Sequence, residues 1–64
     1  MNPLEVINET EAARYLGMSV HSLRARRFTG RQPAYIKFGK SVRYLKSDLE
    51  VFIETSRVTS SDRA

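Results

Sequence analysis

The sequence contains no cysteine, and its single histidine is His21. Disulfides are therefore excluded, and one imidazole without a thiol or carboxylate beside it cannot form a zinc site. No apolar run is longer than three residues, so no segment predicts a membrane span. The sequence shows no nucleophile–base pairing and no phosphate-binding glycine motif. We therefore expect a protein that is not an enzyme and that holds neither a metal nor a cofactor.

Acidic residues are absent from 36 consecutive positions, from Ala12 to Ser47. Nine of the eleven lysines and arginines fall within that stretch, whereas all seven acids lie outside it. Soluble surfaces usually intersperse both signs, so this segregation predicts one strongly positive face of the kind that nucleic-acid-binding proteins carry. Two alternatives stay open: a basic solvated surface without a partner, and a protein-interaction module that docks an acidic protein.

The chain has 64 residues, which is enough for one small domain with a thin core. We expect the folded domain to cover residues 1–56. Residues 57–64 are polar and lack periodicity, which predicts a disordered tail. The lack of cysteine fits a reducing cytoplasm.

The first half of the chain predicts two short helices. Asn8 and Glu11 have the spacing of a capping box, and Gly17 supplies a stop, which together predict a helix over Glu9–Leu16. Ser19 can cap a second helix over residues 20–27 or 20–28. Only three residues would join the helices, as in a helix-turn-helix.

A β-hairpin and a third helix are predicted next. Residues 35–38 and 42–45 alternate around a three-residue loop at 39–41. Alternation predicts one hairpin face with Ile36, Phe38, Val42 and Tyr44, and an opposite face with Lys37 and Arg43. Ser47 and Glu50 then resemble a second capping box, which predicts a helix over residues 48–56. The expected core contains Leu23, Phe38, Leu49 and Phe52.

These elements predict an α+β, mostly helical fold: a winged helix-turn-helix, in which a two-stranded hairpin forms the wing. On a helical wheel centred on Leu23, His21 and Arg24 point away from the core and can reach base edges in the major groove. Arg24 can read guanine through two hydrogen bonds or can contact a phosphate, and both readings stay open. Arg26 and Arg27 lie at the core boundary, where their stems can pack while their guanidinium groups reach phosphates.

The predicted DNA-binding surface has three parts. The second helix contributes Val20, His21, Ser22, Arg24, Ala25, Arg26 and Arg27. The wing contributes Lys37, Lys40, Ser41 and Arg43, which can enter the minor groove or form a solvated tip. Ser19, Arg31 and Lys46 complete the expected phosphate contacts.

Four motifs resemble the excisionase/AlpA-like family, small winged-helix proteins of phages and mobile elements that are related to the DNA-binding domain of MerR regulators. They are NETEAARYLGMS at residues 8–19, PAYIKFG at 33–39, VRY at 42–44 and SDL at 47–49. The resemblance implies that the second helix is the recognition helix and that residues 37–43 form the wing. Family members often have tryptophan or another large apolar residue where this chain has Arg26, and we expect Phe28 to fill that volume.

The resemblance also implies two possible roles in a bacterial host. One is a recombination directionality factor that bends DNA and helps a tyrosine integrase to excise a prophage, and the other is a small transcription regulator. MerR regulators continue into a long dimerising helix, which this sequence does not contain. We therefore expect the protein to be a monomer in solution. As a DNA-binding protein, it is also expected to associate with the nucleoid in the cytoplasm. Contacts between copies would form only on DNA.

Overall fold

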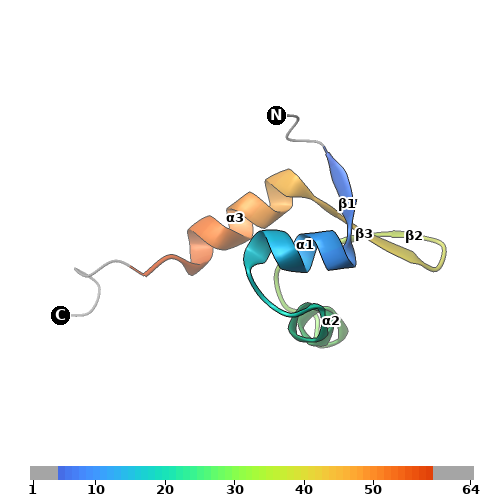
Figure 1. The fold of residues 1–64 in the computed structure, drawn as a ribbon, viewed down its shortest axis with the longest axis horizontal. Helices are drawn as coiled ribbons and strands as arrows, with labels where there is room; N and C mark the ends of the chain where they lie inside the picture. The colour runs from blue at the N-terminus through green and yellow to red at the C-terminus, as the bar shows by residue number, and fades with distance from the viewer. Residues whose placement is uncertain (1–4, 59–64) are drawn as a thin grey trace.

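The computed structural model describes residues 5–58, which form three helices and one three-stranded antiparallel sheet (Figure 1). The elements in chain order are β1 (Val6–Asn8), α1 (Glu9–Leu16), α2 (Val20–Phe28), β2 (Ile36–Phe38), β3 (Ser41–Leu45) and α3 (Lys46–Ser56). This arrangement confirms the predicted α+β winged helix-turn-helix. Of the predicted tail, residues 59–64 lie outside the part of the chain that is described.

The predicted capping box of α1 is confirmed. The Glu11 backbone N–H donates to Asn8 Oδ1 at 2.8 Å, and the Asn8 N–H donates to Glu11 Oε1 at 3.1 Å. Gly17 ends the helix with φ of 73°, in the left-handed region that glycine adopts without steric cost. These local signals fix where α1 begins and where the turn into α2 follows.

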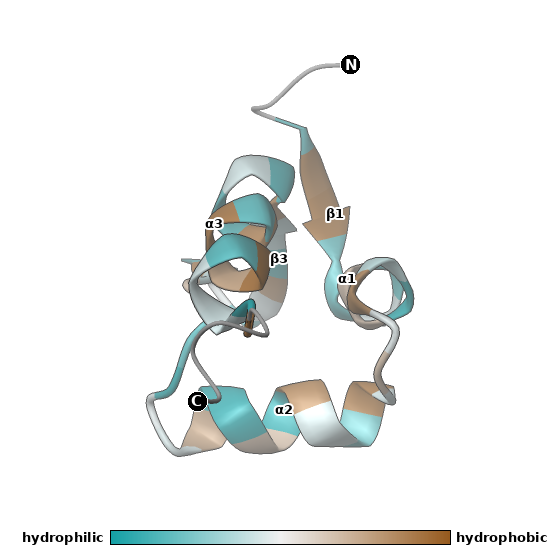
Figure 2. Cartoon of the chain, turned by 90° about the vertical axis from the view of Figure 1, so that its left-hand side faces the viewer, coloured by the Kyte–Doolittle hydropathy of each residue, from teal (hydrophilic) through white to brown (hydrophobic). Residues whose placement is uncertain are grey.

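Helix α2 begins at Val20, as predicted, and continues to Phe28. The Ser22 N–H donates to Ser19 Oγ at 3.0 Å, so Ser19 is the N-cap. α1 and α2 cross steeply: α2 is seen end-on in Figure 1, whereas in Figure 2 it is seen along its length and α1 is end-on. This crossing and the short Gly17-containing turn are the geometry of a helix-turn-helix.

Strand β1 was not predicted from the sequence. It pairs antiparallel with β3, with Ile7 opposite Tyr44, and makes the sheet three-stranded in the order β1-β3-β2. A strand of three residues, the last of which is the N-cap of α1, is too short to show an alternating pattern. This segment is a strand because it pairs with β3, and such a long-range contact cannot be read from the local sequence.

The predicted hairpin is present, but its register differs from the prediction by one residue. Ser41 pairs with Phe38 and Lys37 pairs with Val42, so the turn contains two residues, Gly39 and Lys40, rather than three. Directly paired residues share a face of the sheet. Ile36 and Phe38 therefore share a face with Arg43, whereas Lys37 shares the core-facing side with Val42 and Tyr44. The prediction that Lys37 and Arg43 lie on the same face is wrong.

Helix α3 begins at Lys46, two residues earlier than predicted, and its N-cap is Leu45, which provides no side-chain hydrogen bond. The predicted capping box of Ser47 and Glu50 is wrong, because Ser47 already lies inside the helix. β3 leads directly into α3, and the Lys46 N–H donates to the Glu5 carbonyl at 3.0 Å. A backbone contact with Glu5, the residue before β1, thus satisfies the first N–H donor of α3.

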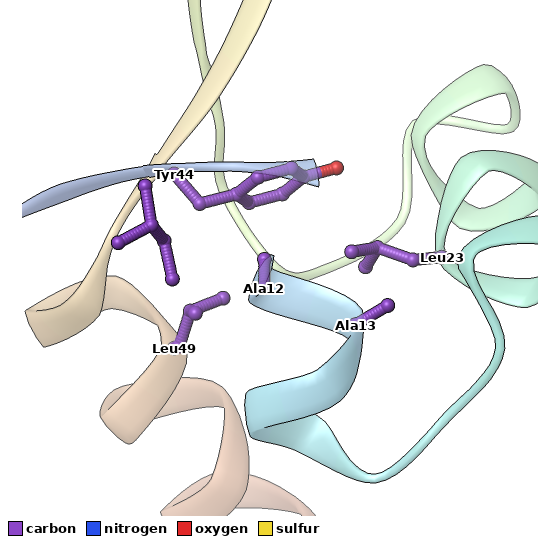
Figure 3. Close-up of a cluster of buried hydrophobic side chains, with 6 residues drawn as sticks. Ala12, Ala13, Leu23, Tyr44 and Leu49 are labelled. Atoms are coloured by element: carbon purple, nitrogen blue, oxygen red, sulfur yellow. The ribbon is translucent and has the colours of Figure 1, made fainter. Parts of the chain in front are cut away.

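One buried cluster joins the helices to the sheet (Figure 3). Its members Leu23, Leu49 and Tyr44 are fully buried. Phe52, which is not a member of this cluster, is 9% exposed. Phe38 is 58% exposed, so its predicted place in the core is wrong. The register explains this result, because Phe38 faces away from the helices. The remaining members of the cluster are Ile7, Ala12 and Ala13.

Within residues 5–58, no helix combines the length and apolar character that crossing a bilayer requires. The same part of the chain contains no group of three or more histidine, aspartate or glutamate side chains placed to hold a metal ion.

Candidate nucleic-acid interface

Helix α2 lies along one side of the molecule, with β1 and the start of α3 at the opposite side (Figures 1 and 2). Leu23 anchors α2 by pointing into the core, where it is fully buried. It is the buried residue of this helix, so most of the remaining surface of α2 faces outward. A nine-residue helix held by one side of its circumference is free to enter a groove of DNA.

Two shallow hollows flank the outer surface of α2. The first has a volume of about 110 Å³ and is lined by His21, Arg24, Ala25 and Phe28. The second has a volume of about 440 Å³ and is lined by Met18, Ser22, Ala25, Arg26, Thr29 and Arg31. Ala25 belongs to both and therefore marks the middle of the outer face. His21, Ser22, Arg24 and Ala25 are exposed, in agreement with the helical wheel.

Arg24 reaches Glu9 from the exposed side of α2. Its Nε lies 3.4 Å from Glu9 Oε1, and its side chain is 49% exposed. Pairs this open to water contribute little, so the guanidinium can leave Glu9 for a stronger acceptor. The position is compatible with either a guanine or a phosphate contact.

Arg27 faces the protein interior. Its Nε donates to Glu9 Oε2 at 2.9 Å and its Nη2 donates to Glu9 Oε1 at 3.2 Å, while only 14% of its side chain is exposed. The Tyr44 hydroxyl also donates to Glu9 Oε2, at 2.9 Å. These contacts tie α2, α1 and β3 together. Its position therefore does not favour the predicted phosphate contact of Arg27, because most of its side chain is covered and two of its five N–H donors bond Glu9.

The electrostatics of this cluster follow from its hydrogen bonds. The Arg27 hydrogen bonds lower the pKa of Glu9, with a further contribution from the Tyr44 hydroxyl. The paired Glu9 carboxylate raises the pKa of Arg27. Burial and the bond to Glu9 raise the pKa of Tyr44. All three shifts favour an ionised Glu9–Arg27 pair with Tyr44 neutral.

Arg26 occupies the position where the family resemblance implies a large apolar residue. Its guanidinium carbon lies 4.9 Å from the centre of the Phe52 ring, and its Nε donates to the Gln32 carbonyl. The expectation that Phe28 fills this volume is wrong, because Phe28 is 73% exposed. The stem of Arg26 packs at the core boundary, as the wheel predicted, while its charged end is held by the loop after α2.

The wing presents lysines at its tip. Lys37, Lys40 and Ser41 are exposed, in agreement with a surface role. Arg43 is half-buried and its Nη1 donates to the Val42 carbonyl at 2.8 Å. Because Lys37 and Arg43 lie on opposite faces, the wing has one cation on each side and Lys40 in the turn.

The other predicted phosphate contacts are divided between the two sides of the molecule. Ser19 and Arg31 are exposed near α2, whereas Val20 is half-buried against the core. Lys46 lies elsewhere: its Nζ is 3.3 Å from Glu5 Oε1 and 5.5 Å from the centre of the Tyr15 ring. It lines a groove with Ile7, Glu11 and Arg14, away from α2. The structure does not bring Lys46 to the α2 surface.

Two residues of the site were missed. Glu9 was interpreted only as an acid flanking the basic stretch, and nothing in the sequence pairs it with residues 18 and 35 positions later. Phe28 is expected from the sequence to fill the volume at Arg26, whereas its ring is exposed. Its position at the end of α2, beside an exposed stripe, was the available signal.

A sequence model described as a helix-turn-helix domain matches residues 8–57, which include α1, α2, the wing and α3. A comparison with curated proteins gives no match. The matched span covers most of the chain and contains the exposed face of α2 described above. The chain belongs to the helix-turn-helix domain family that contains the AlpA and excisionase-like DNA-binding proteins.

Proposed function

We propose that the protein binds duplex DNA in a sequence-specific way, with α2 in the major groove and the wing in the minor groove. The observation that carries this proposal is the outer face of α2, on which His21, Arg24 and Ala25 are exposed side by side. The major groove admits an α-helix and displays a distinct pattern for each base pair. On this face, Arg24 is the residue with the donors that guanine requires.

Phosphate contacts would come from exposed cations around α2. Arg31 lies beside the second hollow, and Lys37 and Lys40 project from the wing. Ser19 and Ser41 add hydroxyl donors. Such contacts fix orientation but carry no base information. A basic wing held in the minor groove favours bent DNA, because bending narrows or widens that groove around the inserted side chains.

We propose that the biological role is that of a recombination directionality factor, which assists a tyrosine integrase in excising a prophage or mobile element. Membership of the family that contains excisionase-like proteins supports this role. In this proposal the protein binds rather than catalyses, and works in the bacterial cytoplasm at the nucleoid. Copies on adjacent sites, or an integrase, would supply the specificity that one small domain lacks.

The experiment begins by selecting bound duplexes from a random library with the full chain. Gel shifts on circularly permuted fragments of the selected site should reveal a bend. If a tyrosine integrase is encoded beside the gene, its excision of a plasmid-borne element should then require the protein. Specific binding without a bend, and without any effect on excision, would instead favour a small transcription regulator. Binding to an acidic protein but to no duplex would favour an interaction module.

A further inference from the structure

Phe28 is the last residue of α2, and its ring is 73% exposed. The ring makes a cation–π contact, because the Arg27 guanidinium carbon lies 4.8 Å from its centre. Arg27 is itself held by two hydrogen bonds to Glu9. A cation that is fixed in the domain therefore holds one face of an exposed aromatic ring. The ring is positioned before any ligand arrives.

Phe28 also lines the hollow on the outer surface of α2. Phe28 and Ala25 are one turn apart and form the apolar part of its lining, while Arg24 and His21 form the polar part. Its volume of about 110 Å³ accommodates a methyl group together with the edge of the base that carries it. The site is thus a small apolar spot next to a guanidinium that is 49% exposed.

The chemistry of the major groove identifies one occupant for such a spot. Base edges in that groove are donors and acceptors, apart from the 5-methyl group of thymine. Alanine and phenylalanine side chains are among those that contact this methyl group. The exposed guanidinium of Arg24 beside this spot matches a polyanion, so the apolar spot lies next to a charge that suits DNA.

We propose that Ala25 and Phe28 form a binding site for the 5-methyl group of a thymine in the recognised sequence, next to the base pair that Arg24 contacts. This inference rests on the proposed function, since it requires α2 to lie in the major groove. It adds a specificity determinant that reads a thymine by its methyl group rather than by hydrogen bonds.

The test replaces thymine by uracil, which removes only the methyl group, at each position of the selected duplex in turn. At one thymine the parent protein should bind the uracil duplex about fourfold more weakly, the change expected for burying one methyl-sized group. Phe28→Ala should bind both duplexes with equal affinity and should keep the melting temperature of the parent. Phe38→Ala is the matched control, since Phe38 is exposed on the wing, and it should keep the fourfold difference.

Specific, salt-dependent binding that no uracil substitution weakens would overturn this inference and leave the proposed function intact. A methyl effect that Phe28→Ala retains would overturn it too, because another side chain would then make the contact. A smaller DNA bend with Phe28→Ala, with no methyl effect in the parent, would show that the ring inserts between base pairs instead. Failure to bind any duplex would defeat the proposed function itself.

Discussion

The Glu9 carboxylate accepts two hydrogen bonds from Arg27, at 2.9 and 3.2 Å, and so joins α1 to α2. Only 11% of the Glu9 side chain and 14% of the Arg27 side chain are exposed. Removing one member of such a pair leaves the other desolvated and unpaired, which costs more than the pair contributes. The orientation of α2 therefore depends on an acid that lies in α1.

Glu9→Gln should lower the free energy of unfolding at pH 7 by about 2 kcal/mol, the loss typical of a charged hydrogen-bond partner. Chemical denaturation followed by circular dichroism measures this difference. The matched control is Glu54→Gln, since Glu54 pairs with Arg57 on the surface, with 65% and 63% of the side chains exposed. That variant should stay near the parent. Equal losses in the two variants would contradict the structural role of Glu9.

The same pair predicts a dependence of stability on pH. The pKa of Glu9 is lowered in the folded state from its ordinary value of 4.5, so the unfolded chain takes up a proton first as the pH falls. Stability from this group is fully present above pH 4.5 and is lost as the pH falls through the folded-state pKa. Between pH 6 and pH 3 the parent should lose more unfolding free energy than Glu9→Gln. Parallel pH profiles would show that Glu9 is not ionised in the pair.

The two arginines that contact Glu9 should have different functions. Arg24→Ala should weaken binding to the selected site far more than binding to random DNA, because Arg24 is exposed on the outer face of α2. Arg27→Ala should lower the melting temperature, since Arg27 is held inside the domain. Fluorescence anisotropy on both DNAs, with thermal melts of each variant, separates these effects. An unchanged melting temperature with Arg27→Ala would contradict the structural role of Arg27 and would favour the phosphate contact instead.

Leu23 and Phe38 differ in burial, so their substitution should affect the stability of the domain differently. Leu23 is fully buried, and Leu23→Ala should cost about 2–5 kcal/mol, which is a large part of the stability of a small domain. Phe38→Ala should change the stability little, because 58% of that residue is exposed. Thermal melts of both variants check this contrast. A severe loss with Phe38→Ala would show that the wing packs against the helices.

Features with local causes were predictable from the sequence. The bounds of α1 follow from the Asn8–Glu11 capping box and Gly17, and the start of α2 follows from Ser19. The exposed stripe on α2 follows from helical periodicity once Leu23 is placed in the core. In each case the residues that decide the structure lie within one or two turns of one another.

Features set by long-range contacts were not predictable. Strand β1 forms because it pairs with β3. Helix α3 begins at Lys46, whose backbone N–H donates to the Glu5 carbonyl. The wing register depends on whether two or three residues form the turn, and a change of one residue exchanges the faces of the strand. Alternation alone fits both turns. The Glu9 cluster joins three elements that are distant in the sequence, so no local pattern indicated it.

The most direct test of DNA binding through a basic face is the dependence of duplex affinity on salt concentration. If the four exposed cations around α2 and the wing, Arg24, Arg31, Lys37 and Lys40, each neutralise one phosphate, the slope of log K against log salt should be about −3.6. Lys40→Ala should reduce the magnitude of this slope by about 0.9, whereas Lys46→Ala, on the other side of the molecule, should leave it unchanged. A slope of about −1 or weaker, or an equal change with the two variants, would contradict the interface assigned to α2 and the wing.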